Sequence, residues 1–500
     1  MKKTIAILLA LVMMLSALAS CKKKAKGTDS ENTPSSSDSG RLAELGSRDF
    51  GGDEVFTILD ANDYPEMHVN FATEETRHAS NINEALYNRD LQLTAKYNLE
   101  NIDYKSMTKA VTGMDEIRLL SANNAMKYDM VISTAVGPTA EGAGGGTLAS
   151  LALQGMLKNL NEVEHLSLDK EWWSPLIYES MLLNDKIFFT TGDIAPSLYQ
   201  APAAMYVNTD EFNKSHQGVD LFQLVEDYEW TIDELLTLTK DLSKDTNNDN
   251  IMNASEDYFG IIIQRGGLPV QDFVIGAGLS FSRIDDNVLK MNLTSQTLGN
   301  LIDEKIAKLF PTKTFEYGGT GSPSEKQQRI INVTFKGGKA VFLAHQLEAA
   351  MFHLRDMEAN YDVLPYPLRN ENQKQYFSLV NNWCDCFVAV PSAVKNDRVE
   401  LIGFIMEAMA AYSHDNLRPL IYEMVLKMQR VNNQQSSEMV DIIMDGIVID
   451  YAIVYDIGGL QDMAKNAALE EMPLESQAAG KQNTINSAIE DIMKAHGLES

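Results

Sequence analysis

The strongest constraint on the fold is an alternation of apolar strands and amphipathic helices near the start of the chain. Three runs have the character of buried strands, at residues 54–59, 101–104 and 128–133, and segments with helical spacing separate them, at 82–97 and 114–124. Parallel strands need long crossover connections, which are usually helices. We therefore expect a βαβαβ unit with a mostly parallel sheet, in which ligands lie beyond the carboxyl ends of the strands.

The first 21 residues have the organisation of a lipoprotein signal peptide. Lys2 and Lys3 precede an apolar run that ends in Leu18-Ala19-Ser20-Cys21, and this run is too short for a permanent membrane span. The residues around Cys21 resemble a bacterial lipobox, which implies cleavage before Cys21 and diacylation of its thiol. The alternative is an ordinary signal peptide with a chance cysteine. We expect a signal peptide at 1–20 and a lipid anchor on the outer face of the cytoplasmic membrane.

Composition limits the partners of the chain. Residues 21–50 carry the expected lipid site and a tether rich in Lys, Ser, Pro and Gly, which cannot bury enough apolar surface to order itself. The formal net charge is −28, so the surface repels nucleic acid and anionic lipid head groups. We expect a monomer that binds no nucleic acid and meets the membrane only through its lipid.

The other two cysteines, Cys384 and Cys386, are one residue apart. In a strand they would point to the same face, and a disulfide across so short a loop would be strained. We expect two thiols, with a metal site as the weaker alternative because no further His or Cys lies nearby in the sequence.

Several short motifs carry a resemblance to a known family. They are Met156-Leu157-Lys158-Asn159-Leu160, Glu171-Trp172-Trp173, Asn184 to Asp193, Met205 to Phe212, Tyr228 to Leu235, Phe335 to Phe342 and Tyr361 to Pro367. In this order they resemble family 1 extracellular solute-binding proteins of ABC importers, in the branch that serves sugars and oligosaccharides. The resemblance covers roughly residues 54–420. Two departures are the absence of a proline before Trp230 and a long tail from Ala411 to Ser500.

The resemblance implies a two-lobe α/β fold like that of periplasmic binding proteins. Each lobe would have a central, mostly parallel sheet flanked by helices, with hinge strands between the lobes. We expect lobe 1 at 51–190 plus 345–388 and lobe 2 at 191–344 plus 389–500. The crossings would lie near Thr190–Asp193, His345 and Val388–Pro391. Closure of the lobes around a ligand excludes water and strengthens polar contacts.

The implied function is capture of a carbohydrate, expected to be an oligosaccharide, for delivery to the permease of an ABC importer. No catalysis and no required cofactor are expected, since neither a Gly-x-Ser-x-Gly elbow nor a His-Glu-x-x-His site occurs. A secreted glycan-degrading lipoprotein, a surface adhesin and a receptor for a peptide or polyol remain the alternatives. Paired carboxylates for hydrolysis could come from any chain with 70 acidic residues, so they decide nothing.

Aromatic and acidic residues near the expected crossings are the candidate ligand contacts, because flat rings suit the apolar faces of sugars and carboxylates accept hydroxyl groups. Trp383 precedes the third crossing, and of the adjacent Trp172 and Trp173 one is expected to pack and the other to line the cleft. The alternative for each tryptophan is core packing, and for the carboxylates a capping role or a solvated loop. The full set is Trp383, Asp193, Trp173, Trp172, Glu74, Glu75 and Tyr199.

The segment 245–256 fits a calcium loop of the EF-hand type. Its expected ligands, at positions one, three, five, seven and twelve, are Asp245, Asn247, Asp249, the Ile251 carbonyl and Glu256. Asn250 stands where glycine is usual, and asparagine is the next best residue in a left-handed conformation. The alternative is a solvated turn rich in Asn and Asp. A bound calcium would be structural and would do no chemistry.

Overall fold

The computed structural model describes residues 40–63, 68–135, 146–264, 266–310, 330–380, 387–428 and 434–498, with no side chains for 424–428. Cys21, Trp383, Cys384 and Cys386 lie outside these residues, so the predictions made for them stay predictions. Within the described part of the chain, no helix is both long enough and apolar enough to cross a membrane.

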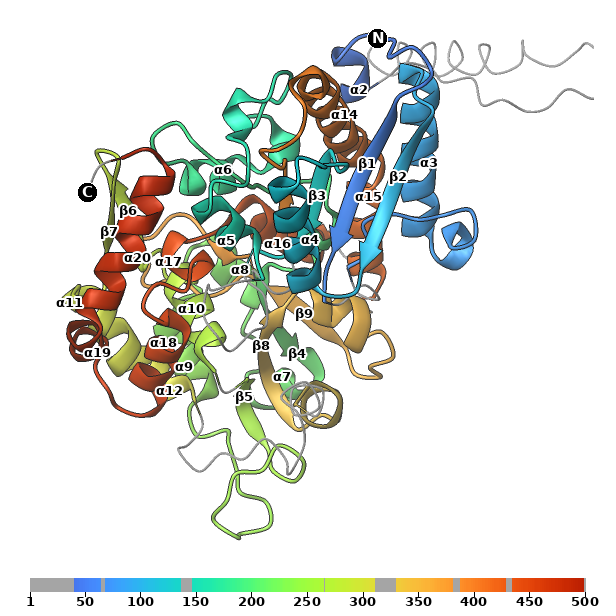
Figure 1. Ribbon diagram of the computed structural model, residues 1–500. Coiled ribbons are helices and arrows are strands. Elements are labelled where there is room, and N and C mark those ends of the chain that lie inside the picture. Colours follow the sequence, from blue (N-terminus) through green and yellow to red (C-terminus); the bar gives the residue numbers. More distant parts are fainter. Residues whose placement is uncertain are drawn as a thin grey trace, which may run out of the picture. The chain divides into compact units, whose positions relative to one another are not determined.

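The first sheet contains the expected βαβαβ unit (Figure 1). Its strand order is β11 (Phe387–Ala389), β3 (Met130–Ser133), β1 (Val55–Ala61) and β2 (Asn101–Met107). β1 pairs in parallel with both β2 and β3, and β11 joins antiparallel to β3. The crossovers are α3 (Asn81–Tyr97) and α4 (Ala110–Ala122), which confirms the strands and helices predicted from the sequence.

Local chemistry explains this unit. Ile58 and Leu59, on opposite faces of β1, are both fully buried, as in a strand covered by helices on both sides. Helix α3 begins at Ser80, whose side chain accepts a hydrogen bond from the Asn83 amide, and ends at Asn98 in a left-handed conformation. Gly113 on α4 lets the helix approach β1, because a Cβ there would lie 2.3 Å from the Ala61 Cβ.

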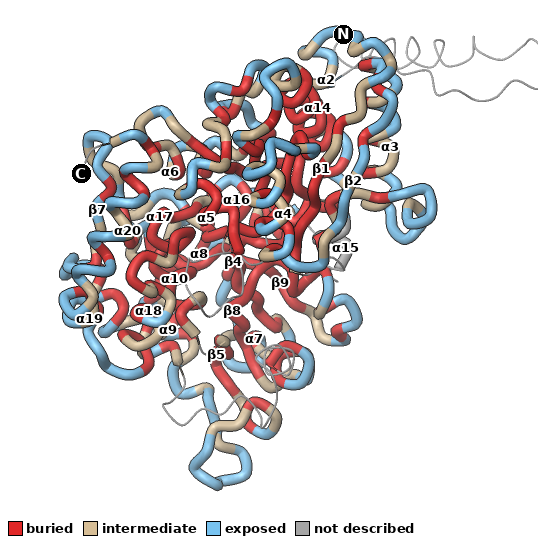
Figure 2. The backbone as a smooth tube through the Cα atoms, viewed as in Figure 1, coloured by how far each residue is buried: buried red, intermediate tan, exposed pale blue. Residues whose placement is uncertain are grey.

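The second sheet has the order β5 (Phe259–Ile263), β8 (Ala340–Gln346), β4 (Ala203–Asn208) and β9 (Tyr361–Leu364). β5 and β8 are parallel, whereas β4 runs antiparallel to both β8 and β9. All four strands are buried along their length (Figure 2). The two sheets with their flanking helices form the two lobes that the resemblance implied.

The expected lobe boundaries are not those of the sheets. β9 belongs to the segment 345–388, expected in the first lobe, yet it pairs with β4 in the second sheet. No crossing occurs at His345, which lies inside β8. Helix α14 (Val399–Asn416), expected in the second lobe, packs against α3 beside the first sheet. Strand pairing is non-local, so motif order alone does not reveal which sheet a strand joins.

The connection between the lobes is built from several short pairings. Thr190 bridges Val388 in the first sheet, and the chain then enters β4 of the second sheet at Ala203. Strand β10 (Ser378–Leu379) pairs in parallel with β12 (Ile447–Val448) shortly before the chain reaches β11.

The remaining elements surround the two sheets. The helices are α2 (Arg41–Glu44), α5 (Leu148–Leu153), α6 (Pro175–Met181), α7 (Thr209–Ser215), α8 (Leu221–Glu226), α9 (Ile232–Thr239), α10 (Gly267–Gly276), α11 (Gln296–Asn300), α12 (Ala307–Leu309), α15 (Arg418–Met428), α16 (Gln434–Asp445), α17 (Tyr451–Val454), α18 (Leu460–Leu469), α19 (Leu474–Gly480) and α20 (Gln482–Ala495). A hairpin is formed by β6 (Ser282–Asp285) and β7 (Val288–Met291). In the described residues, π-helical segments occur at Leu301–Ile306, Ile330–Phe335 and Ala349–His353.

Candidate functional site

Asp193 belongs to the chain segment that connects the two sheets. Its side chain lines a cavity of about 230 Å³. Its side chain is 4% exposed, and its carboxylate accepts hydrogen bonds from the Tyr199 hydroxyl and from Nδ1 of His414. The sequence suggested ligand binding or capping of backbone amides for this aspartate, whereas the carboxylate contacts side chains. The cavity is lined by Glu171, Ser174, Pro175, Leu176, Asp193, Leu198, Arg418, Met444, Asp445 and Ile447.

Charge and burial shape this cavity. Burial disfavours the charged form of Arg418, but the neighbouring Tyr422, Tyr199 and Asp193 outweigh it and raise the pKa of Arg418 above its usual range. Burial and the charge of Asp193 raise the pKa of Tyr199 well above its ordinary value, so this tyrosine stays protonated and donates to Asp193. The cavity therefore presents a guanidinium beside a carboxylate that is already engaged.

Trp172 and Trp173 take a structural position. Their side chains are 3% and 0% exposed, and both indole N–H groups donate to the Glu407 carboxylate on α14, over 2.9 and 2.7 Å. The expectation that one ring packs and the other lines the cleft is wrong, because a one-turn helix at Glu171–Trp173 lets both rings reach one acceptor. Burial raises the pKa of Glu407. The Trp172 carbonyl in turn accepts the Asp193 amide over 2.9 Å, so this cluster positions the Asp193 segment.

Glu74 and Glu75 lie apart from this arrangement. Both are exposed, on the segment between β1 and α3, and Glu74 forms an ion pair with Arg77 over 3.1 Å. The structure thus favours the solvated-loop alternative for these two residues. It brings together Asp193, Tyr199, Trp172 and Trp173 from the predicted set.

A buried polar cluster lies at the carboxyl edge of the first sheet, and none of its residues was predicted from the sequence. Asp60 at the end of β1 is 2% exposed and accepts hydrogen bonds from the side-chain amides of Asn70, over 2.9 Å, and Asn62, over 3.3 Å. Burial raises the pKa of Asp60 to about 6, although these amides oppose the shift. Ser133, at the end of the neighbouring β3, lies in register with Ala61.

Three polar atoms of this cluster have no hydrogen-bond partner among the described residues: Oδ1 of Asn70, Oγ of Ser133 and Oγ1 of Thr134. Buried polar groups are almost always paired, because leaving one unpaired costs free energy. Such a group at the strand ends of an α/β sheet is positioned to meet a ligand. The signal in the sequence was the pair of polar runs that directly follow two apolar strands, Asp60-Ala61-Asn62 and Ser133-Thr134.

The second sheet presents a polar edge of a different kind. Gln346 at the end of β8 donates to the Asp272 carboxylate on α10 over 3.2 Å, and burial raises the pKa of Asp272 well above its usual range. Burial also lowers the pKa of His345 to about 3, so this imidazole is neutral at physiological pH. This edge therefore offers hydrogen-bonding groups with little net charge.

Arg89 connects the first edge to the Asp193 segment. It is fully buried on α3 and donates to the carbonyls of Asn70 and Ile194, each over 3.3 Å, and to the Ser413 hydroxyl over 3.4 Å. Nε of Arg89 donates to Asp90, and Nη2 also donates to the Tyr104 hydroxyl. One side chain thus ties the loop that supplies Asn70 to the segment that supplies Asp193.

Side chains of the segment 245–256 form hydrogen bonds with its own backbone and with one another. Asp245 accepts the Asn250 amide over 2.7 Å, Asp249 accepts the Ile251 amide over 2.8 Å, and Asn247 donates to Glu256 over 2.9 Å. Asn250 has the expected left-handed conformation, with φ of 61°. No three His, Cys, Asp or Glu side chains in the described ranges are placed to hold a metal ion. Calcium binding by this loop stays a prediction.

No protein-family model matches the chain, and no curated protein matches it. Several solved structures are similar to the chain. A cyclo/maltodextrin-binding protein complexed with maltotetraose has a TM-score of 0.53 at 12% identity, over 89% of this chain and 97% of the other. An uncharacterized protein of Listeria monocytogenes EGD-e has a TM-score of 0.55 at 12% identity, over 87% of this chain and all of its own.

The maltose-binding periplasmic protein MalE of Listeria monocytogenes, in complex with maltose, has a TM-score of 0.50 at 12% identity, over 87% of this chain and 98% of its own. At such identities the similarity concerns the fold. The resemblance inferred from the sequence motifs is confirmed at that level: this chain has the two-lobe fold of the maltose- and maltodextrin-binding proteins.

Proposed function

We propose that this chain is a carbohydrate-binding receptor, which holds its ligand between two α/β lobes and does not convert it. The fold supports this proposal, since two of the similar structures are named as maltose- or maltodextrin-binding proteins and hold maltose or maltotetraose. The order of motifs in the sequence points to the same class.

The observation that carries the proposal is the buried polar cluster at the carboxyl edge of the first sheet. Asn70, Ser133 and Thr134 each keep a buried oxygen without a partner in the described residues, and Asn70 also donates to the Asp60 carboxylate. Sugar hydroxyls both donate and accept hydrogen bonds, so they complement hydroxyl, amide and carboxylate oxygens. A ligand at this edge would relieve the cost of the unpaired groups, which favours its binding.

We also propose a membrane location and a permease partner for this receptor. Diacylation of Cys21 would hold the receptor on the outer face of the cytoplasmic membrane, because two acyl chains give durable attachment. From there it would deliver an oligosaccharide to the permease of an ABC importer by opening its lobes. The lipobox at Leu18-Ala19-Ser20-Cys21 and the motif order support this placement.

Thermal melting of a soluble chain that begins at Lys22 tests the proposal. Maltose, maltotetraose, a tetrapeptide and sorbitol are added one at a time. A ligand that binds only the folded state stabilises it by about 2.7 kcal/mol at one hundred times its dissociation constant. We expect a concentration-dependent rise in melting temperature with a saccharide. A rise with the peptide or polyol alone, or a shortened saccharide after incubation, contradicts the proposal.

A matched pair of variants ties the effect to the edge. Thr134→Val removes one hydroxyl from the polar cluster, and Ser378→Ala removes a buried hydroxyl on β10. Neither hydroxyl has a partner among the described residues. We expect Thr134→Val to lose most of the saccharide-induced shift while Ser378→Ala keeps it. Equal shifts in both variants would place the ligand elsewhere.

A further inference from the structure

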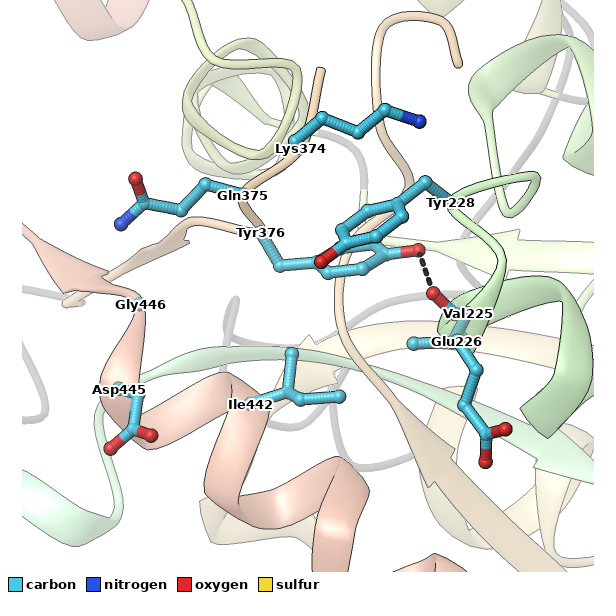
Figure 3. Close-up of a pocket in the computed structure, with 9 residues that line it drawn as sticks. All are labelled: Val225, Glu226, Tyr228, Lys374, Gln375, Tyr376, Ile442, Asp445 and Gly446. Atoms are coloured by element: carbon cyan, nitrogen blue, oxygen red, sulfur yellow. Dashed lines mark hydrogen bonds between the residues drawn. The ribbon is translucent and has the colours of Figure 1, made fainter. Parts of the chain in front are cut away.

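A second cavity of about 230 Å³ lies between the end of α8, the segment 374–376 and the end of α16 (Figure 3). It shares only Asp445 with the Asp193 cavity. Its lining residues are Val225, Glu226, Tyr228, Lys374, Gln375, Tyr376, Ile442, Asp445 and Gly446. None of the ligand contacts expected from the sequence belongs to it.

Two stacked tyrosines occupy the middle of this pocket (Figure 3). The rings of Tyr228 and Tyr376 are 6.1 Å apart at an interplanar angle of 13°. Tyr376 is buried, and its hydroxyl donates to the Val225 carbonyl over 3.0 Å, which fixes the lower ring. Tyr228 is half-buried, with Nζ of Lys374 4.7 Å from its ring centroid. The pair is therefore a rigid aromatic platform with an exposed, flexible lysine above it.

The backbone of Tyr228 is unusual for a residue with a side chain. It has φ of 62°, directly after the C-cap of α8, and its amide donates to the Val225 carbonyl over 3.2 Å. Helices that end this way usually place glycine at this position, because a Cβ disfavours the left-handed conformation. Folding alone would favour glycine here. A tyrosine at this position places its ring on Tyr376, and strained residues of this kind cluster at ligand sites.

The polar groups around the platform are mixed in charge. Glu226 and Asp445 are exposed carboxylates, and neither has a hydrogen-bond or ion-pair partner in the described part of the chain. Lys374 and Gln375 add an ammonium group and an amide at the other side. An anionic ligand would meet the two carboxylates, and a cationic one would meet Lys374. A neutral ring with hydroxyl groups can use both donors and acceptors while its apolar face lies on the platform.

We propose that this pocket binds one pyranose ring of a neutral glycan, as a second carbohydrate contact separate from the edge of the first sheet. Its volume is below the range of about 300–1,000 Å³ typical of sites that enclose a drug-sized ligand, so it holds a single ring whose neighbours extend into solvent. The platform supplies apolar area at low entropic cost, and the four polar side chains orient the hydroxyls. This contact adds to the proposed receptor function and does not require it.

The test uses the chain from Lys22 and immobilised neutral hexasaccharides of glucose, xylose and mannose, with binding followed by interferometry. Tyr228→Gly removes the ring and relieves the left-handed backbone. Asn124→Gly is the matched control, because Asn124 is an exposed residue with φ of 48° outside the pocket. We expect Tyr228→Gly to melt at or above the wild-type temperature and to bind at least one of these glycans ten-fold or more weakly. Asn124→Gly should bind like the wild type.

Other outcomes would overturn this pocket or the receptor function. Wild-type binding by Tyr228→Gly, with weakened binding by Thr134→Val, overturns this pocket and leaves the receptor function standing. A wild-type chain that binds none of the three glycans overturns both. An immobilised basic peptide is measured beside the glycans. If Tyr228→Gly weakens binding to this peptide alone, the pocket is a protein contact and the glycan proposal is overturned. Should Tyr228→Gly melt early, Tyr228→Asn repeats the test, because asparagine tolerates the left-handed backbone.

Discussion

Glu407 and Asp60 are both buried carboxylates, yet they serve different ends. Glu407 is surrounded by donors: two indole N–H groups and the Ser167 amide, which donates over 3.2 Å. Asp60 accepts from two asparagine amides, but one of these neighbours, Asn70, keeps a buried oxygen without a partner in the described residues. A buried carboxylate by itself therefore marks no binding site. Under the proposed function, the unpaired oxygen of Asn70 is what distinguishes the Asp60 edge from Glu407, whose hydrogen-bond donors are supplied by the fold.

The largest effect on stability is expected from substitution of Glu407. Glu407→Ala leaves two indole N–H groups and one amide buried without an acceptor, and each costs about 1–3 kcal/mol. We expect the free energy of unfolding in urea to fall by at least about 3 kcal/mol. Glu407→Gln keeps an acceptor oxygen and should lose less than half as much. Equal losses in both variants would mean that the negative charge, and not the acceptor geometry, holds the tryptophans.

The second effect is a pH dependence at Asp60. Burial raises the pKa of Asp60 to about 6 in the folded chain, against about 3.9 unfolded, so the folded state binds the proton more tightly. The contribution of this group to stability is then complete below about pH 4 and is lost as the pH rises to about 6, by about 3 kcal/mol.

The difference in stability between the wild type and Asp60→Asn isolates the contribution of Asp60. Asp362 has a similar burial-raised pKa of about 6, whereas burial lowers the pKa of His345 to about 3, so several groups shape the wild-type curve. We expect the wild-type stability minus that of Asp60→Asn to decline between pH 4 and pH 6 in urea titrations. A flat difference would show that Asp60 is solvated.

A smaller effect on stability is expected from Ser133, at the end of β3. Ser133→Ala removes a fully buried hydroxyl that has no partner in the described residues. We expect the ligand-free chain to gain up to about 1 kcal/mol, because an unpaired buried group is removed together with its desolvation cost. A loss of about 1 kcal/mol in urea unfolding would mean that the hydroxyl is paired in solution.

The smallest effect is expected from the loop at 245–256, which is exposed. Calcium should raise the melting temperature of the wild type by a degree or so at millimolar concentration, through linkage to the folded state. Glu256→Gln, which weakens the expected bidentate ligand, should lose that shift. Magnesium at the same concentration is the control, and an equal rise with both ions would identify a general ionic effect instead.

The sequence by itself determined the parts of this protein that depend on local pattern. The apolar runs at 54–59 and 128–133 became β1 and β3, because continuous apolar runs and helical spacing are properties of neighbouring residues. Motif order also indicated the two-lobe fold. Asp193 was predicted as a ligand contact from its place at an expected crossing, and it lines a cavity in the structure.

Only the tertiary structure decided which side chains meet. Trp172 contacts a carboxylate 235 residues later in the chain, and Tyr228 stacks on Tyr376, so neither contact leaves a periodic trace in the sequence. Ser133 lies at the end of β3, and only the parallel register of β1 and β3 brings it opposite Ala61 at the end of β1. Long-range pairing is set by packing of the whole chain, and a local pattern carries no record of it.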